Sequence, residues 1–122
     1  MNKENFVLLV EDDQDIRELV MEAFQMMGVS AKSAVNGEDA LEKLKHDGIP
    51  SLILLDLMMP KFDGIWFCNE RKKYPEFVEI PVVILTADTT VESKIADLGV
   101  DGILKKPVKI DDLLRTTDRY LH

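Results

Sequence analysis

The sequence predicts an α/β fold in which a five-stranded parallel sheet is covered by helices on both faces. Short, continuous apolar runs alternate along the chain with stretches whose apolar residues recur at helical intervals. This alternation is typical of strands buried on both faces and linked by crossover helices. Five such units are too few for an eight-stranded barrel, which needs about 250 residues. We therefore expect residues 1–122 to form one doubly wound domain.

Five apolar runs are the expected strands, and the second is weak by propensity. They cover residues 6–10, 30–34, 51–55, 81–85 and 102–104. Pro81 opens the fourth run, a position where its missing N–H does little harm. The fifth run is short and leads directly into Lys105-Lys106-Pro107.

Capping residues mark most of the helices expected between these strands. The first helix carries its apolar residues from Ile16 to Met27, with Met27 assigned to the core, and Gly28 stands where a left-handed C-cap belongs. Asn36 is expected to cap the second helix, and the third is expected to run from Asp63 or Gly64 to a stop at Tyr74-Pro75. The fourth helix is expected over 89–98, before Gly99, and the fifth over 110–121.

Composition excludes several classes of function. The chain has 15 Lys and Arg residues against 23 Asp and Glu residues, a net charge of −8, which disfavours direct binding to nucleic acid and to anionic lipid surfaces. Cys68 is the single cysteine, so no internal disulfide forms. The chain also lacks a secretory apolar segment and a bilayer-spanning run of about 18 residues. A cytoplasmic location without membrane insertion is expected.

Polar residues follow the expected strands where each strand ends. Glu11 and Asp12 follow the first run, Asp56 follows the third, Thr86 follows the fourth and Lys106 follows the fifth. Because ligands of open α/β sheets bind at the carboxyl ends of the strands, we expect these side chains to meet. Three close carboxylates repel one another and recruit a hard divalent ion, with Mg²⁺ favoured over Ca²⁺.

An ionised Asp56 in such a site could attack phosphorus and form an aspartyl phosphate. Lys106 would pair with one phosphoryl oxygen, and the hydroxyl of Thr86 would donate to another. Each residue also has a structural explanation taken alone: acids at a helix start are often caps, and Asp is common where a loop begins. Their joint placement at separate strand ends favours the chemical explanation.

The chain resembles the receiver domain of bacterial two-component response regulators. The resemblance spans essentially residues 1–122 and is carried by Val10-Glu11-Asp12-Asp13, Leu55-Asp56-Leu57-Met58-Met59-Pro60 with Asp63-Gly64, Leu85-Thr86-Ala87 and Lys105-Lys106-Pro107. It implies a flavodoxin-like (βα)5 fold with strand order 2-1-3-4-5. It also implies that Asp56 is the phospho-acceptor, Thr86 the switch hydroxyl and Lys106 the phosphate-contacting lysine, with a cis Lys106-Pro107 peptide.

The resemblance also assigns the metal ligands. Ile16-Arg17 sets Glu11 and Asp12 as the acid pair and leaves Asp13 as an extra acid that opens the loop. Asp12 and Asp56 would bind Mg²⁺ directly, Glu11 would act through water, and the main-chain carbonyl of Met58 would add a ligand. Many receivers have an aromatic residue three positions before the lysine, where this chain has Ile103. This chain therefore lacks the aromatic ring that swings inward on activation in those receivers.

The resemblance implies a switch, and not an enzyme that acts on an external substrate. A sensor histidine kinase or a histidine phosphotransfer protein would phosphorylate Asp56, and the surface of the fourth helix, fifth strand and fifth helix would change its binding properties. The output would be a protein target or an attached domain, with a phosphorylation-dependent dimer as one option. Two alternatives are an aspartyl-phosphate phosphatase or phosphotransferase and an interaction module that never takes phosphate. Against the phosphatase, position 58 is Met where such enzymes usually carry a second acid.

Overall fold

A computed structural model describes residues 5–57, 63–87 and 98–121. The described elements are β1 (Val7–Val10), α1 (Gln14–Met26), β2 (Ala31–Ala34), α2 (Gly37–His46), β3 (Leu52–Asp56), α3 (Gly64–Arg71), β4 (Val82–Thr86), β5 (Gly102–Lys105) and α5 (Ile110–Leu121). The helix expected over residues 89–98 falls almost entirely on residues outside these ranges. The longest described helix, α1, has 13 residues, and none combines the length and hydropathy that a bilayer span requires.

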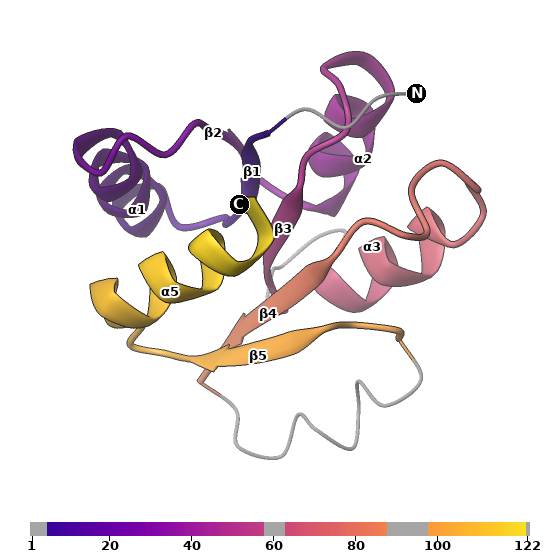
Figure 1. Ribbon diagram of the computed structural model, residues 1–122. Helices are drawn as coiled ribbons and strands as arrows, with labels where there is room; N and C mark the ends of the chain where they lie inside the picture. Colours follow the sequence, from indigo (N-terminus) through magenta and orange to yellow (C-terminus); the bar gives the residue numbers. More distant parts are fainter. Residues whose placement is uncertain (1–4, 58–62, 88–97, 122) are drawn as a thin grey trace.

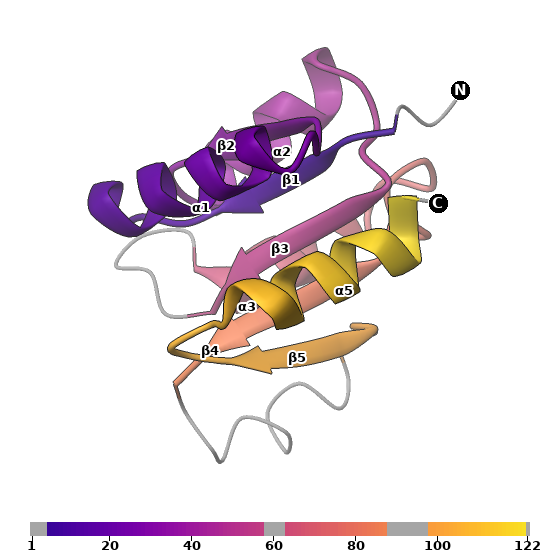
Figure 2. The ribbon, with the colours of Figure 1, turned by 60° about the vertical axis from the view of Figure 1, so that its left-hand side comes forward.

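The five strands form one parallel sheet in the order β2-β1-β3-β4-β5. Helices α1 and α5 cover one face of the sheet, and α2 and α3 cover the other (Figures 1 and 2). The strand order reverses beside β1, because the chain first pairs β2 on one side of β1 and then β3 on the other. The structure confirms the expected fold class and the strand order.

Strand residues alternate between the two layers of the core. On β1, Val7 and Leu9 pack in the cluster with Phe24 of α1, whereas Leu8 and Val10 pack in the cluster on the α2 and α3 side. All four residues of β1 are buried, because both faces of a parallel sheet are covered by crossover helices. The continuous apolar runs in the sequence therefore reflect two packed faces.

Side-chain caps set where the helices begin. Asp13, Asn36 and Asp63 each accept a hydrogen bond from the backbone N–H three residues later, at the start of α1, α2 and α3. These bonds satisfy donors that a helix leaves unpaired in its first turn. Past the end of α1, Gly28 has φ of +73°, the left-handed conformation expected of a C-cap glycine.

Helix α1 leaves more of its apolar residues exposed than the sequence analysis expected. Only Phe24 of this helix is buried, whereas Leu19 is 64% exposed and Ile16 is 39% exposed. The assignment of Met27 to the core is wrong, because its side chain is 55% exposed. Helical spacing identifies the apolar stripe of α1, but it does not show which of its residues pack on the sheet and which remain exposed.

Helix α3 ends earlier than expected, at Arg71 rather than at Tyr74-Pro75. The Arg71 side chain is 2% exposed, and its guanidinium donates to the main-chain carbonyls of Phe77, Val78 and Gly99 at 3.3, 2.7 and 3.1 Å. One side chain thus joins the end of α3 to the α3–β4 connection and to the residues that lead into β5. The sequence analysis gave this arginine no role.

We predict that Arg71→Met lowers the free energy of unfolding by about 2 kcal/mol or more, because carbonyls that accept from the guanidinium lose their donor in or near the core. Urea unfolding followed by circular dichroism would measure the change. Lys72→Met is the matched control: Lys72 is an exposed neighbour, and its substitution should change stability by about 0.5 kcal/mol or less. Equal stability of Arg71→Met and the parent would contradict this role.

Candidate functional site: an acidic pocket at the carboxyl edge of the sheet

The strand ends bring the expected site residues to one edge of the sheet. Asp56 is the last residue of β3 and Thr86 the last residue of β4. Glu11 follows β1 directly, and Lys106 follows β5. The parallel register pairs Val10 with Leu55 and Asp56 with Leu85, so these ends lie side by side.

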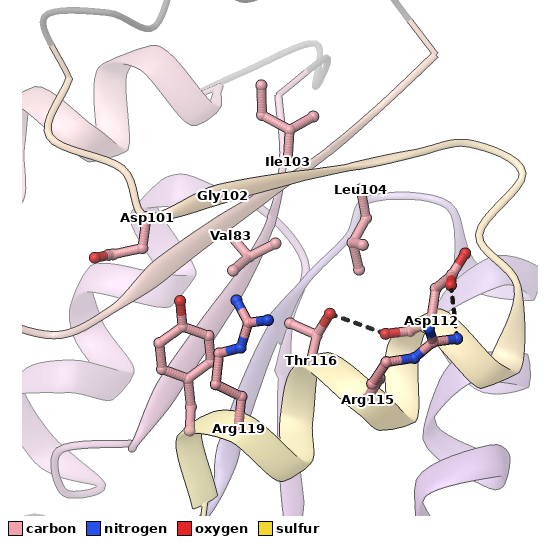
Figure 3. A pocket seen from close by; sticks show the side chains of 10 residues that line it. Val83, Asp101, Gly102, Ile103, Leu104, Asp112, Arg115, Thr116 and Arg119 are labelled. Atoms are coloured by element: carbon pink, nitrogen blue, oxygen red, sulfur yellow. Dashed lines mark hydrogen bonds and ion pairs between the residues drawn. The ribbon is translucent and has the colours of Figure 1, made fainter.

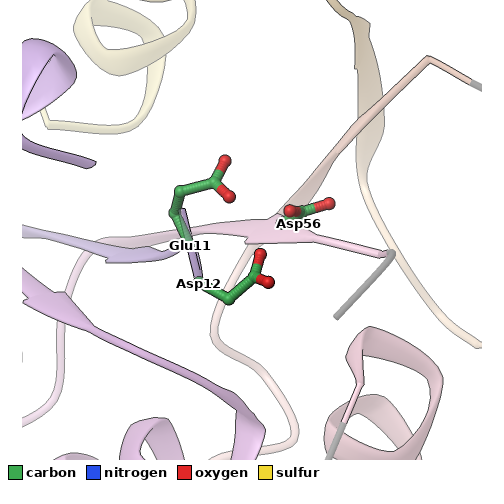
Figure 4. A group of neighbouring side chains, drawn as sticks. All are labelled: Glu11, Asp12 and Asp56. Atoms are coloured by element: carbon green, nitrogen blue, oxygen red, sulfur yellow. The ribbon is translucent and has the colours of Figure 1, made fainter. Parts of the chain in front are cut away.

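Three carboxylates face one another at this edge (Figure 4). Glu11, Asp12 and Asp56 each offer an oxygen, and these oxygens all lie within 4.8 Å of one another. Glu11 is 1% exposed and Asp56 is 3% exposed, whereas Asp12 is exposed to solvent. Two of the three negative charges are therefore largely removed from water, which strengthens their mutual repulsion.

The amine of Lys106 partly balances these acids. Its Nζ lies 3.1 Å from Oε1 of Glu11 and 3.2 Å from Oδ2 of Asp56. Burial opposes the charge of Lys106, but the hydrogen bond to Glu11 and the charges of Asp56 and Glu11 outweigh it and hold the pKa of Lys106 above its usual 10.5. Lys106 therefore stays a cation next to the nucleophile candidate.

One positive charge does not neutralise the cluster. Burial, and then the adjacent Asp56, raises the pKa of Glu11 from 4.5 to about 7, although Lys106 acts in the opposite direction. A carboxyl group with such a pKa takes up a proton near neutral pH. The pocket can therefore accept either a proton or a further cation.

The backbone beside Lys106 continues the β4–β5 pairing to the end of the sheet. The N–H of Lys106 donates to the carbonyl of Thr86 at 2.8 Å, so the two residues lie side by side, with Thr86 1% exposed. The Lys106-Pro107 peptide is cis, as expected. Met58, whose main-chain carbonyl was expected to bind the metal, lies outside the described residues.

The start of α3 approaches the end of β3 closely, and glycine permits the approach. A Cβ at Gly64 would lie 2.9 Å from both the main-chain oxygen of Asp56 and the Cα of Leu57. The N–H of Gly64 also donates to the carbonyl of Leu57 at 3.4 Å. Asp63 therefore caps α3, and Gly64 allows the start of this helix to pack against the end of β3.

The residues that follow the acid pair organise the loop that carries it. Asp13 caps α1 by accepting from the N–H of Ile16 at 3.1 Å, which agrees with its assignment as an extra acid outside the pair. Arg17 donates to the main-chain carbonyls of Glu11 and Asp12 at 2.8 and 3.4 Å. The sequence analysis used Arg17 only to set the register of the acid pair, and no sequence signal indicated these two bonds.

Comparisons with known proteins identify the family. Residues 7–118 match the response regulator receiver domain. The chain is 34% identical over 128 residues to the probable transcriptional regulator ycf27 of Porphyridium aerugineum, covering 98% of this chain and 51% of that protein. It is also 34% identical over 110 residues to response regulator MprA of Mycobacterium leprae, covering 88% of this chain and 47% of that protein. The chain thus spans about half the length of these curated relatives.

Solved structures agree with this family. Chemotaxis protein CheY4 of Vibrio cholerae superimposes with a TM-score of 0.85 at 31% identity, over 94% of this chain and 97% of that chain. The receiver domain of Francisella response regulator 1452 gives a TM-score of 0.82 at 29% identity, over 94% of both chains. The chain belongs to the receiver domains of response regulators, and its fold is flavodoxin-like.

The donor set of this site fits a magnesium ion. Carboxylate oxygens are the ligands that hard divalent cations prefer, and Mg²⁺ takes one or two carboxylates while it keeps several waters. Exposed Asp12 and buried Asp56 offer such oxygens, and Glu11 lies close enough to act directly or through water. A bound cation would also favour the ionised form of Glu11, whose pKa burial and the adjacent Asp56 raise.

We predict that the affinity for Mg²⁺ falls as the pH drops through about 7. Below this pH Glu11 is protonated in the metal-free protein and must lose its proton to contribute its charge. The apparent affinity should then fall by up to about 10-fold per pH unit and level off above about pH 8. Isothermal titration calorimetry from pH 5.5 to 8.5 would measure the profile.

The stability of the metal-free fold depends on pH in the opposite direction from the Mg²⁺ affinity. A carboxyl pKa raised from 4.5 to about 7 makes the metal-free fold lose stability as the pH rises between these two values. Glu11→Gln removes the titrating group, so its Mg²⁺ affinity should be weaker and nearly independent of pH in this range. A parent Mg²⁺ affinity that stays constant between pH 6 and 8 would contradict the assignment of this pH dependence to Glu11.

Proposed function

We propose that this receiver domain is a Mg²⁺-dependent phosphorylation switch in which Asp56 accepts a phosphoryl group from a histidine kinase or a histidine phosphotransfer protein. One observation carries the proposal: Lys106 Nζ lies within 3.2 Å of both Asp56 and Glu11, inside a cluster of three acids. A nucleophilic carboxylate, a fixed cation and a metal-ligand set are the parts that phosphoryl transfer requires.

In the proposed reaction, an oxygen of Asp56 forms a bond to phosphorus as the bond from phosphorus to the donor imidazole nitrogen breaks. The electron pair of the broken bond stays on the imidazole, which then takes up a proton from solvent. A bound Mg²⁺ supplies charge neutralisation for the phosphoryl oxygens. Lys106 would exchange its contact with the Asp56 carboxylate for one with a phosphoryl oxygen, and the Thr86 hydroxyl would donate to another.

Phosphorylation adds a charge of about −1.5 to −2 and new acceptor oxygens to the buried end of β3. Because Thr86 and Lys106 sit at the ends of β4 and β5, their rearrangement would be transmitted to β5 and its neighbours. Ile103, which stands where many receivers have an aromatic residue, pairs in register with Ile84 of β4 and is half-buried. In this proposal a shift of the aliphatic Ile103 takes the place of an aromatic swing.

The surface of β5 and α5 has the chemistry of a polar interaction site (Figure 3). A hollow of about 200 Å³ is lined by charges of both signs, including Asp101, Asp112, Arg115 and Arg119. Arg115 pairs with Asp112 at 3.3 Å and is largely exposed, so exchanging this contact for an intermolecular one would cost little. We propose this surface for output, either to a protein target or to a second receiver.

The phosphodonor protein is proposed to bind next to α1. A mostly apolar hollow of about 450 Å³ adjoins Glu11 and Lys106 and includes Ile16, Leu19 and Val108. Leu19 is 64% exposed although it is apolar. A helix that buried these side chains would bring its phosphohistidine beside Asp56. Acidic α1 residues such as Asp15 and Glu18 favour basic residues on that helix.

The output of the whole protein depends on more than this domain. The relatives ycf27 and MprA are about twice as long as the region they share with this chain. An attached output domain and a separate protein target are both consistent with the proposal. In either case the chain changes a partner and does not turn over an external substrate, and its cytoplasmic location stays a prediction.

We predict that incubation with Mg²⁺ and a small acyl phosphate adds one phosphoryl mass to the parent and none to Asp56→Asn. Intact-protein mass spectrometry measures both, and EDTA should abolish the parent's gain. Asp118→Asn removes an equal charge from the exposed side of α5 and serves as the control. No adduct on the parent would support an interaction module that never takes phosphate, and turnover of unrelated phosphomonoesters would support an enzyme.

A second variant separates the reaction from docking of the donor. Leu19→Asp should react normally with the acyl phosphate, because Leu19 does not belong to the acidic pocket. Its phosphorylation by a phosphohistidine donor protein should slow by about 10-fold or more, because the apolar contact is lost. Equal slowing with both donors would contradict the proposal that the phosphodonor protein docks next to α1.

A further inference from the structure

Arg17 reaches back from α1 to the loop that carries the acid pair. Its Nη1 donates to the main-chain carbonyl of Glu11 at 2.8 Å and to that of Asp12 at 3.4 Å. Both contacts are to peptide oxygens, and the side chain is half-buried. The guanidinium therefore acts on the backbone of the two acidic residues.

The position of Arg17 in α1 is electrostatically unfavourable for the helix itself. It is the fourth residue of a helix that begins at Gln14, and a cation near a helix N-terminus opposes the helix dipole. Its two bonds to the preceding loop give a physical reason for a cation at this place. Asp13 caps the same helix end through the N–H of Ile16, so the loop and the start of α1 form one connected unit.

The two acids depend on this unit to different degrees. The Glu11 carboxylate is held by Lys106 at 3.1 Å and by the N–H of Asp13 at 3.3 Å. The Asp12 side chain is exposed, and no donor in the described part of the chain holds its carboxylate. Arg17 therefore contacts Asp12 at its backbone and not at its carboxylate.

We infer that Arg17 is a positioning residue of the metal site: it holds the Glu11–Asp12 backbone so that Asp12 points at Asp56 before Mg²⁺ binds. The inference rests on the proposed function, since it assigns a role within the same site. Among the described residues, Arg17 bonds to no carboxylate of the acidic pocket and acts through the two peptide carbonyls. Outer contacts of this kind commonly change metal affinity by about 10- to 100-fold.

The sign of the effect distinguishes positioning from simple electrostatics. A positive charge near the pocket repels Mg²⁺, so loss of the charge alone would tighten binding. Loss of positioning would weaken binding, because the loop must then be ordered when the ion binds. Arg17→Gln removes both the charge and the double contact. Arg17→Lys keeps the charge, but its side chain is shorter and ends in a single ammonium group.

The test is the dissociation constant of Mg²⁺ alone, measured by isothermal titration calorimetry without a phosphodonor. We expect about 10-fold weaker binding for Arg17→Gln and a smaller but clear weakening for Arg17→Lys. Lys73→Gln, which removes an equal charge from an exposed site just after α3, should leave the constant unchanged. Urea unfolding of the metal-free variants shows that each is folded at the titration temperature.

A functional readout completes the design. At saturating Mg²⁺, phosphorylation of Arg17→Gln by the acyl phosphate should return to the parent rate, because the defect lies in metal binding. Unchanged or tighter Mg²⁺ binding by both Arg17 variants would overturn the inference and leave the proposed function intact. Failure of the parent to bind Mg²⁺ would overturn both together.

Discussion

The site depends on the repulsion among three carboxylates that the sheet holds within 4.8 Å of one another. Two unit charges at such a distance repel by roughly 3–4 kcal/mol at an effective dielectric constant of 20. Lys106 offsets part of this repulsion through its contacts with Glu11 and Asp56. Burial, and then the adjacent Asp56, still raise the pKa of Glu11 despite Lys106. Binding of a divalent cation is the response that such a site favours, and the proposed phosphoryl transfer depends on it.

Much of this arrangement could be predicted from the sequence because it follows from the ends of strands. Four of the five apolar runs lead into a residue of distinct chemistry, and in a parallel sheet all carboxyl ends lie at one edge. The places of Asp56, Thr86 and Lys106 therefore followed from the runs that precede them. The cap at Asn36 was equally local, since its side chain accepts from the N–H three positions later.

The contacts that local patterns do not determine were missed. Arg71 donates to Gly99, 28 residues away, and an arginine at the end of a helix gives no sign that it is buried. Arg17 bonds to backbone carbonyls, so no complementary side chain in the sequence pointed to them. The exposure of Met27 was missed because helical spacing defines an apolar stripe but not how much of it the neighbouring helices cover.

The most direct measurement is the free energy of unfolding of Asp12→Asn and of the parent, each with and without 10 mM Mg²⁺. Glu22→Gln is the control, because it removes an equal charge from the exposed side of α1. Removal of one repelling carboxylate should raise the metal-free stability by about 1 kcal/mol, and Mg²⁺ should no longer stabilise the variant as it does the parent. An Asp12→Asn protein that is less stable without metal and gains as much from Mg²⁺ as the parent would contradict this account.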